Sequence, residues 1–274
     1  MPSSVSITFI GGGNAARSLI GGLVARGQSA DSIHVSAPSP QSRAFLHGEF
    51  GVHAHADNIE AAKHGSVWVF AVKPQIMRGV CEALSPSARA QRPLIISIAA
   101  GITCRQLQRW LGDELAIVRA MPNTPVQLGC GAIGLFANPN VSAEQRRLAD
   151  SLLQATGLTA WIDAEAQMDV VTALSGSGPA YVFLLAEAMQ AAAVAQGMSA
   201  ETAHALTVQT IFGAARMLQE SSESAALLRQ RVTSPGGTTR AAQDIFDAAG
   251  FQALVDRAIA AATRRGRELS AAND

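Results

Sequence analysis

Apolar residues in the first half of the chain form short runs that alternate with longer segments of helical character. Runs such as VWVFAV and LIISIA are almost wholly apolar, which is typical of parallel strands covered on both faces. The pattern predicts strands at 5–10, 33–36, 66–71, 94–98, 115–121 and 132–136, and helices at 14–26, 40–49, 58–64, 75–84 and 104–111. This alternation predicts an α/β fold with a doubly wound, mainly parallel sheet and right-handed crossovers.

The pattern changes after about Ile162, where strand signals stop. Long alanine-rich segments follow at 164–197, 199–221, 239–249 and 251–270. Many carry apolar residues on more than one face, which indicates helices packed between subunits, or else burial against the first domain. We therefore expect two domains, residues 1–163 and an all-helical region 164–274.

Composition narrows the class of protein. Hydrophobic residues make up 48% and charged residues 15% of the 274 positions, and the formal net charge is zero. A nucleic-acid-binding protein usually has a basic excess, so we expect no such partner. No apolar run approaches about 20 residues and no basic segment precedes the first strand, so we expect neither a membrane span nor a signal peptide.

Cysteine and histidine spacing gives no metal signature. Cys81, Cys104 and Cys130 form no CxxC pair, and we interpret them as reduced, mostly buried residues of a cytoplasmic protein. His53 and His55 could be a metal pair, but a strand would place both on a polar face, and no carboxylate or third ligand is evident beside them. We therefore predict no metal site.

A glycine-rich loop after the first strand predicts dinucleotide binding. Gly11-x-Gly13-x-x-Ala16 lies between a strand and a helix, as close approach of a pyrophosphate to a helix N-terminus requires. The order strand, loop, helix and second strand favours this function over a structural turn. The predicted contacts are Gly11, Gly13, Asn14 and Ala15.

The end of the second predicted strand favours NADP over NAD. An acidic residue there would bind the ribose hydroxyls of NAD, but the region holds Ser36, Ala37, Ser39, Ser42 and Arg43. Hydroxyls and an arginine can bind a 2′-phosphate. The alternative is that Arg43 is simply a solvated helix residue.

Two further loops leave the carboxyl ends of strands, where open α/β sheets bind ligands. Small residues and a proline there leave room for a flat nicotinamide, although Lys73 could instead be a solvated strand end. The residues are Ala71, Val72, Lys73 and Pro74 in one loop and Ala99, Ala100 and Gly101 in the other.

Near the chain's end, SPGGTT leads directly into a helix-forming run. One capping residue is enough for an ordinary helix start. Two adjacent glycines favour instead a cradle of backbone N–H groups and hydroxyls for a small anion, although a capping role stays open for either threonine. The residues are Ser234, Pro235, Gly236, Gly237, Thr238 and Thr239.

Five motifs together carry a resemblance to a known family. GGGNAA, AVKPQ, MPNTP, LSGSGPAY and SPGGTT occur in this order, and the chain resembles pyrroline-5-carboxylate reductase nearly from end to end. The resemblance implies a Rossmann-type first domain and a helical substrate-binding and dimerisation domain. It also implies NAD(P)H-dependent reduction of the ring imine of 1-pyrroline-5-carboxylate to L-proline, the last step of proline biosynthesis.

The resemblance also implies residue roles. Asn58 matches an asparagine near the adenosine ribose, and Ala71 to Pro74 match the segment beside the nicotinamide. Ser234 to Thr239 match the loop that binds the substrate carboxylate, with Thr239 near the ring nitrogen. In this family a second subunit completes the active site, which implies a homodimer or larger homo-oligomer. The pair Ser36-Ala37 lacks one hydroxyl that members often carry.

Two rival functions remain open at this stage. Another NADP-dependent imine reductase or 3-hydroxyacid dehydrogenase of similar architecture would place a lysine from the helical domain at the reacting carbon, but residues 170–219 contain no lysine. A non-catalytic NADP-sensing protein would have the same fold without hydride transfer. For LSGSGPAY, substrate contact and helix packing are both open, with Pro179 kinking or beginning a helix.

Overall fold

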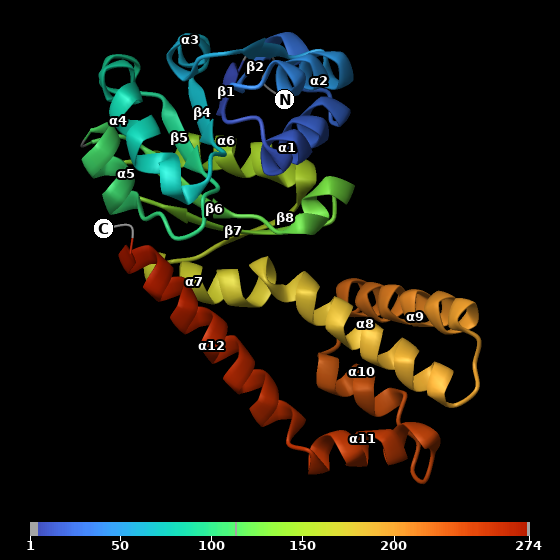
Figure 1. The fold of residues 1–274 in the computed structure, drawn as a ribbon. Coiled ribbons are helices and arrows are strands. Elements are labelled where there is room, and N and C mark those ends of the chain that lie inside the picture. Colours follow the sequence, from blue (N-terminus) through green and yellow to red (C-terminus); the bar gives the residue numbers. More distant parts are fainter. Residues whose placement is uncertain (1–4, 113, 273–274) are drawn as a thin grey trace. The chain divides into compact units, whose positions relative to one another are not determined.

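A single parallel-dominated sheet organises the first part of the chain (Figure 1). The structure is a computed structural model that describes residues 5–112 and 114–272. The strands found there are β1 (Ile7–Ile10), β2 (Ile33–Ser36), β3 (His53–His55), β4 (Val67–Phe70), β5 (Leu94–Ser97), β6 (Ile117–Met121), β7 (Gly131–Ala137) and β8 (Gly157–Trp161). Their order is β3-β2-β1-β4-β5-β6-β7-β8, and β6–β7 is the antiparallel pair among otherwise parallel neighbours.

Helices lie between the strands along the chain. They are α1 (Asn14–Ala25), α2 (Pro40–Phe50), α3 (Asn58–Ala62), α4 (Pro74–Gln91), α5 (Cys104–Leu111) and α6 (Ala143–Leu153). The buried residues form two apolar clusters: Phe9 belongs to one, whereas Ile10 and Trp68 belong to the other. Because successive strand residues point to opposite faces, both faces of the sheet are covered, and the predicted doubly wound fold is confirmed.

The sheet has a topological switch point at β1 and β4. These two strands are hydrogen-bonded neighbours although β2 and β3 intervene in sequence. The chain therefore winds away from β1 in one direction and from β4 in the other. Ligands of such sheets bind at the carboxyl ends of the strands flanking this point.

The remainder of the chain is helical. Its helices are α7 (Met168–Val171), a π-helical turn (Thr172–Gly176), α8 (Gly178–Ala195), α9 (Ala200–Glu220), α10 (Ala225–Arg231), α11 (Thr238–Ala248) and α12 (Phe251–Ala272). Two compact units result: residues 178–260 form one, and residues 5–177 with the end of α12 form the other. The boundary that we predicted at 163/164 stays a prediction. Pro179 is the second residue of α8, so it begins a helix.

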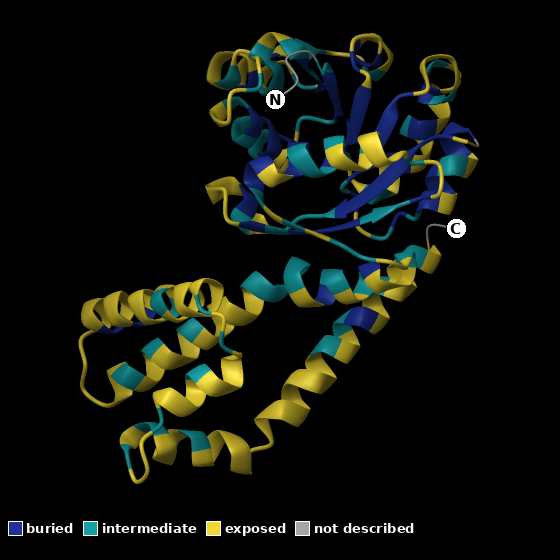
Figure 2. Ribbon diagram, turned by 180° about the vertical axis from the view of Figure 1, so that it is seen from behind, coloured by how far each residue is buried: buried dark blue, intermediate teal, exposed yellow. Residues whose placement is uncertain are grey.

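Within the helical unit, few side chains are buried. Ala203 and Thr207 of α9 are buried, whereas α8, α10 and α11 have no buried residue. The strands of the sheet, in contrast, are largely buried (Figure 2). An 18-residue window within Glu165–Ala195 has a mean hydropathy of 1.3, and this helix meets the length and composition expected of a membrane span. This corrects our expectation that no such run exists.

Several elements differ from the sequence prediction. β3, β8, α6 and α10 were not predicted, although α6 begins at a capping box formed by Ser142 and Gln145. The helix at α4 continues to Gln91, beyond the predicted end at residue 84, with Pro86 inside it.

Candidate active site

The glycine-rich loop after β1 contacts the loop after β4. Gly11 has φ of +103°, and a Cβ atom there would lie 2.9 Å from the Ala71 carbonyl oxygen and 2.9 Å from Val72 Cγ1. The N–H of Ala71 donates a hydrogen bond to the carbonyl of Ile10 at 2.9 Å. Only glycine can adopt this positive φ and let the two loops approach so closely. Gly11 therefore allows the loop after β1 to pack against the loop after β4 at the switch point.

The N-terminus of α1 is open. Gly13 is the N-cap residue, no side chain caps the helix, and the first turn has no acidic residue. A Cβ atom at Gly13 would meet nothing within 4 Å, and Gly13, Asn14 and Ala15 are exposed. The first N–H groups of a helix have no partner within the helix, so this end fits a pyrophosphate of a dinucleotide.

Ser36 supports the glycine-rich loop from within the sheet. It is buried, its hydroxyl accepts a hydrogen bond from the N–H of Gly11 at 3.0 Å, and it donates to the carbonyl of Phe9 at 3.4 Å. Ala37 is 2% exposed and lies against Gly12, where a Cβ atom would be 3.0 Å away. Direct contacts of Ser36 and Ala37 with a cofactor stay predictions.

Two arginines flank the end of β2. Arg43 donates to the carbonyls of Ala37 at 2.9 Å and Pro38 at 2.7 Å, so it is more than a solvated helix residue. Arg17 donates to the hydroxyl of Ser42 at 3.2 Å. The sequence analysis missed Arg17, although its place one helical turn after Gly13 could have indicated it. Together they supply positive charge where a 2′-phosphate is expected.

The other predicted cofactor residues lie at neighbouring strand ends or helix starts. Lys73 is exposed and precedes α4, and Asn58 is the half-buried first residue of α3. In the loop after β5, Ala99 is buried, Ala100 is exposed and Gly101 has φ of +72°. These positions suit the crevice at the carboxyl edge of the sheet, and their contacts with a cofactor stay predictions.

The MPNTP and LSGSG motifs are joined by hydrogen bonds and packing. Asn123 donates from Nδ2 to the carbonyl of Ser175 at 3.1 Å and accepts from the N–H of Ala132 at 2.9 Å. A Cβ atom on Gly176 would lie 2.7 Å from Met121 Cε. The π-helical turn Thr172–Gly176 therefore packs closely on the end of β6, and such turns are frequent at functional sites.

In the helical unit, the SPGGTT loop ends at an uncapped helix. Gly237 is the N-cap residue of α11, without a capping side chain, and the first turn has no acidic residue. Because neither Thr238 nor Thr239 occupies the capping position, an ordinary side-chain cap does not account for them. The positive φ, +70°, belongs to Gly236, and a Cβ atom on Gly237 would lie 2.6 Å from Ser234 Oγ. The tight turn leaves the first N–H groups of α11 available to an anion.

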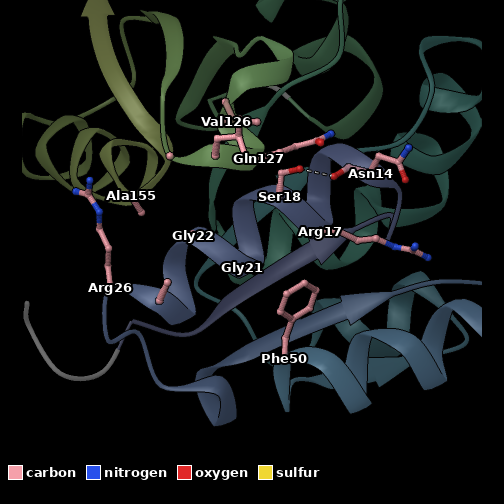
Figure 3. Close-up of a pocket in the computed structure, with 13 residues that line it drawn as sticks. Asn14, Arg17, Ser18, Gly21, Gly22, Arg26, Phe50, Val126, Gln127 and Ala155 are labelled. Carbon is pink, nitrogen blue, oxygen red and sulfur yellow. Dashed lines mark hydrogen bonds between the residues drawn. The ribbon is translucent and has the colours of Figure 1, made fainter. Parts of the chain in front are cut away.

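A pocket of about 710 Å³ runs beside α1 (Figure 3). It extends from Asn14 to Arg26 along the helix and is bordered by the turn Thr124–Leu128. Of the predicted cofactor residues, only Asn14 lines it. The pocket is therefore a hollow along the side of α1, separate from most of the crevice at the strand ends.

Comparisons with known proteins identify the family of the chain. Residues 165–269 match the family model described as pyrroline-5-carboxylate reductase dimerisation, and residues 6–101 match the one described as NADP oxidoreductase coenzyme F420-dependent. The first of these covers the apolar run Glu165–Ala195.

Individual relatives match nearly the whole chain. A pyrroline-5-carboxylate reductase of Pseudomonas aeruginosa is 52% identical over 98% of this chain and 98% of its own. A solved structure of the Coxiella burnetii enzyme has a TM-score of 0.94 at 45% identity, covering 97% of this chain and 99% of that one. A Plasmodium falciparum pyrroline carboxylate reductase solved with NADP bound has a TM-score of 0.86 at 29% identity, covering 98% and 99%. The chain belongs to the pyrroline-5-carboxylate reductase family.

Proposed function

We propose that this protein reduces the ring imine of 1-pyrroline-5-carboxylate to L-proline with NADPH. The observation that carries the proposal is a pair of uncapped helix N-termini, both preceded by glycines and without acidic residues in the first turn. The one at α1 suits the cofactor pyrophosphate, and the one at α11 suits the substrate carboxylate. At each site, free backbone N–H groups at the positive end of a helix dipole face the position expected for the ligand's negative charge.

The chain's own part in the reaction is positioning. The reduced nicotinamide, when bound, supplies a hydride. The backbone of Gly237 to Thr239 holds the carboxylate, and the Thr239 hydroxyl orients the ring nitrogen, which already carries its proton when the hydride reaches the carbon. A protonated imine is already electrophilic at carbon, so no strong acid is required of Thr239.

A second copy of the chain is the partner that we propose for the helical unit. Large apolar side chains are exposed on several of its helices, among them Val182, Phe183, Leu184 and Leu185 on α8, Leu206, Val208 and Phe212 on α9, and Ile245 and Phe246 on α11. Such an exposed apolar surface is typical of an interface, and the matching family model is one for dimerisation. We therefore propose a homodimer or larger homo-oligomer whose active sites use both subunits, in the cytoplasm.

The direct test is NADPH oxidation followed by its absorbance. We expect turnover with pyrroline-5-carboxylate, formation of proline, and no turnover with 3-hydroxyacids and NADP. Oxidation of hydroxyacids alone would favour the dehydrogenase alternative. Tight NADPH binding without turnover of either substrate would favour a sensor, and both results would contradict the proposal.

A further inference from the structure

Four histidines gather at the edge of the sheet. They are His34 on β2, His53 and His55 on β3, and His64 just after α3. In the parallel register His34 is opposite His53, and His55 lies two residues further along β3, so these three side chains share one face. Helix α3 packs against both strands, and Figure 1 shows it beside β2. The sequence showed no further ligand beside His53 and His55. The structure brings two more histidines, His34 and His64, next to them.

Three of these rings bring nitrogen atoms together. His34 Nδ1 lies 3.1 Å from His55 Nε2, and one ring nitrogen each from His34, His55 and His64 lie within 4.8 Å of one another. Two imidazoles on a tetrahedral zinc ion, with Zn–N bonds of about 2.0–2.1 Å, have their nitrogens about 3.3 Å apart. The nitrogens of His34 and His55, 3.1 Å apart, are already close to this separation. The His64 side chain is 41% exposed, so it has room to rotate inward.

We propose that His34, His55 and His64 bind one divalent transition-metal cation, with zinc as the preferred type. Imidazole nitrogen is a common zinc ligand, and three of them leave a fourth position for water. Glu60 Oε1 lies 3.9 Å from His64 Nε2. From there the carboxylate can accept a hydrogen bond from a ligand ring or a bound water and offset part of the cation's charge.

The protonation state of the rings agrees with this geometry. Burial, followed by the neighbouring imidazoles of His64, His53 and His55, lowers the pKa of His34 to about 4. Burial also lowers the pKa of His55. His34 and His55 are thus neutral at neutral pH, which is the form that binds a cation.

The site would be structural. A cation held by these residues would cross-link β2, the edge strand β3 and the end of α3. The opposite end of α3 starts at Asn58, where the ribose contact is predicted. No ligand belongs to the predicted cofactor or substrate contacts, so the cation should stabilise this edge without taking part in reduction.

The test is zinc binding by the full-length chain, freed of any histidine tag and treated with a chelator. Zn²⁺ is titrated in competition with a chromophoric chelator, and Co²⁺ is added separately to record the visible absorption of a tetrahedral site. We expect one cation per chain, and a higher melting temperature with Zn²⁺ because the ligand binds the folded state. His64→Gln should weaken binding at least about 100-fold, exceeding the loss typical of outer-shell partners.

Two matched variants control for other histidines. His53→Gln removes a ring of the same cluster outside the ligand set, and His204→Gln removes one on α9. Both should bind one cation as the unmodified chain does. Because His64 is exposed, its variant is expected to fold, which circular dichroism checks. Absence of stoichiometric binding, or equal affinity in the His64→Gln and unmodified chains, would overturn the site. A loss in His53→Gln as large as in His64→Gln would overturn the ligand set.

Discussion

The backbone N–H of Gly11 donates a hydrogen bond to the buried hydroxyl of Ser36 at 3.0 Å. This contact joins the carboxyl ends of β1 and β2, which are 25 residues apart in sequence. It fixes the loop from which the α1 helix starts. We therefore propose that the hydroxyl positions the predicted cofactor site, even without a direct contact to the cofactor.

Removing this hydroxyl should weaken NADPH binding. Ser36→Ala leaves the N–H of Gly11 without its partner, and a typical hydrogen bond contributes about 0.5–1.5 kcal/mol, so we expect the NADPH dissociation constant to rise about two- to tenfold. Fluorescence titration measures it. Ser85→Ala removes a hydroxyl that bonds the Leu111 carbonyl, and it should leave NADPH affinity unchanged. Equal affinity in both variants would contradict the positioning role.

Arg17 and Arg43 should determine the preference for NADPH over NADH. A hydrogen bond to a charged group contributes about 1.5–3 kcal/mol, so Arg43→Ala or Arg17→Ala should lower kcat/KM with NADPH about ten- to a hundredfold. With NADH, kcat/KM should barely change, because NADH lacks the 2′-phosphate. Arg26→Ala, at the far end of α1, is the control. Equal losses with both cofactors would show that the arginines only stabilise the loop.

The arginine variants test the cofactor preference more directly than an acidic substitution at Ala37, the position that the sequence pattern points to. Aspartate at Ala37 should still disfavour NADPH by repelling the phosphate. Because Ala37 is 2% exposed, however, the variant would also bury a charge and lose stability.

The helical unit should associate in solution. We expect sedimentation velocity to give a dimer or larger species at assay concentration. Phe183 is 67% exposed in the single chain, so Phe183→Glu should place a charge in the interface, dissociate the oligomer and lower activity. Leu158→Glu on β8 changes a residue that is 72% exposed in the other unit, and it should do neither. A fully active monomer would be inconsistent with shared active sites.

The three cysteines should react very differently with an alkylating reagent. Burial raises the pKa of Cys81 to about 12 and raises the pKa of Cys104 as well, whereas Cys130 is exposed. Since the thiolate is the reactive form, iodoacetamide at about pH 8 should modify Cys130 alone in the native protein. Mass spectrometry should then find all three modified in denaturant. Rapid native labelling of Cys81 or Cys104 would contradict their burial.

Sequence reasoning worked where local pattern and fold agree. The apolar strands of the central sheet and the helix Cys104–Leu111 are confirmed, because continuous burial leaves a clear signal. β3 was missed because it has three residues, two of them histidines. β8 was missed because its residues are half-buried or exposed and Gly157 begins it with φ of +155°.

The candidate site likewise has parts that the sequence could predict and parts that it could not. Motif spacing could predict the glycine loop, since its chemistry lies within a few consecutive residues. It could not predict that Arg17 reaches Ser42, or that His64 joins His34, because these meetings depend on how helices pack on the sheet.

The central claim is that the SPGGTT loop holds the substrate carboxylate. Its most direct measurement compares KM for pyrroline-5-carboxylate with NADPH affinity in loop variants. Gly237→Val would crowd Ser234 Oγ and block close approach, so KM should rise sharply. Thr239→Ala removes one hydroxyl, and kcat/KM should fall about ten- to over a hundredfold. Thr239→Ser should restore most of it.

The control is Gly213→Ala on α9, where a Cβ atom would meet nothing within 4 Å, and its kinetics should match those of the unmodified chain. NADPH affinity, measured by fluorescence titration, should be nearly the same in all four variants. We therefore expect the loop variants to change the kinetic constants for the substrate and to leave NADPH affinity unchanged. Folded Gly237→Val and Thr239→Ala variants that reduce the substrate with unchanged efficiency would contradict it, and would leave the loop as the start of a helix and nothing more.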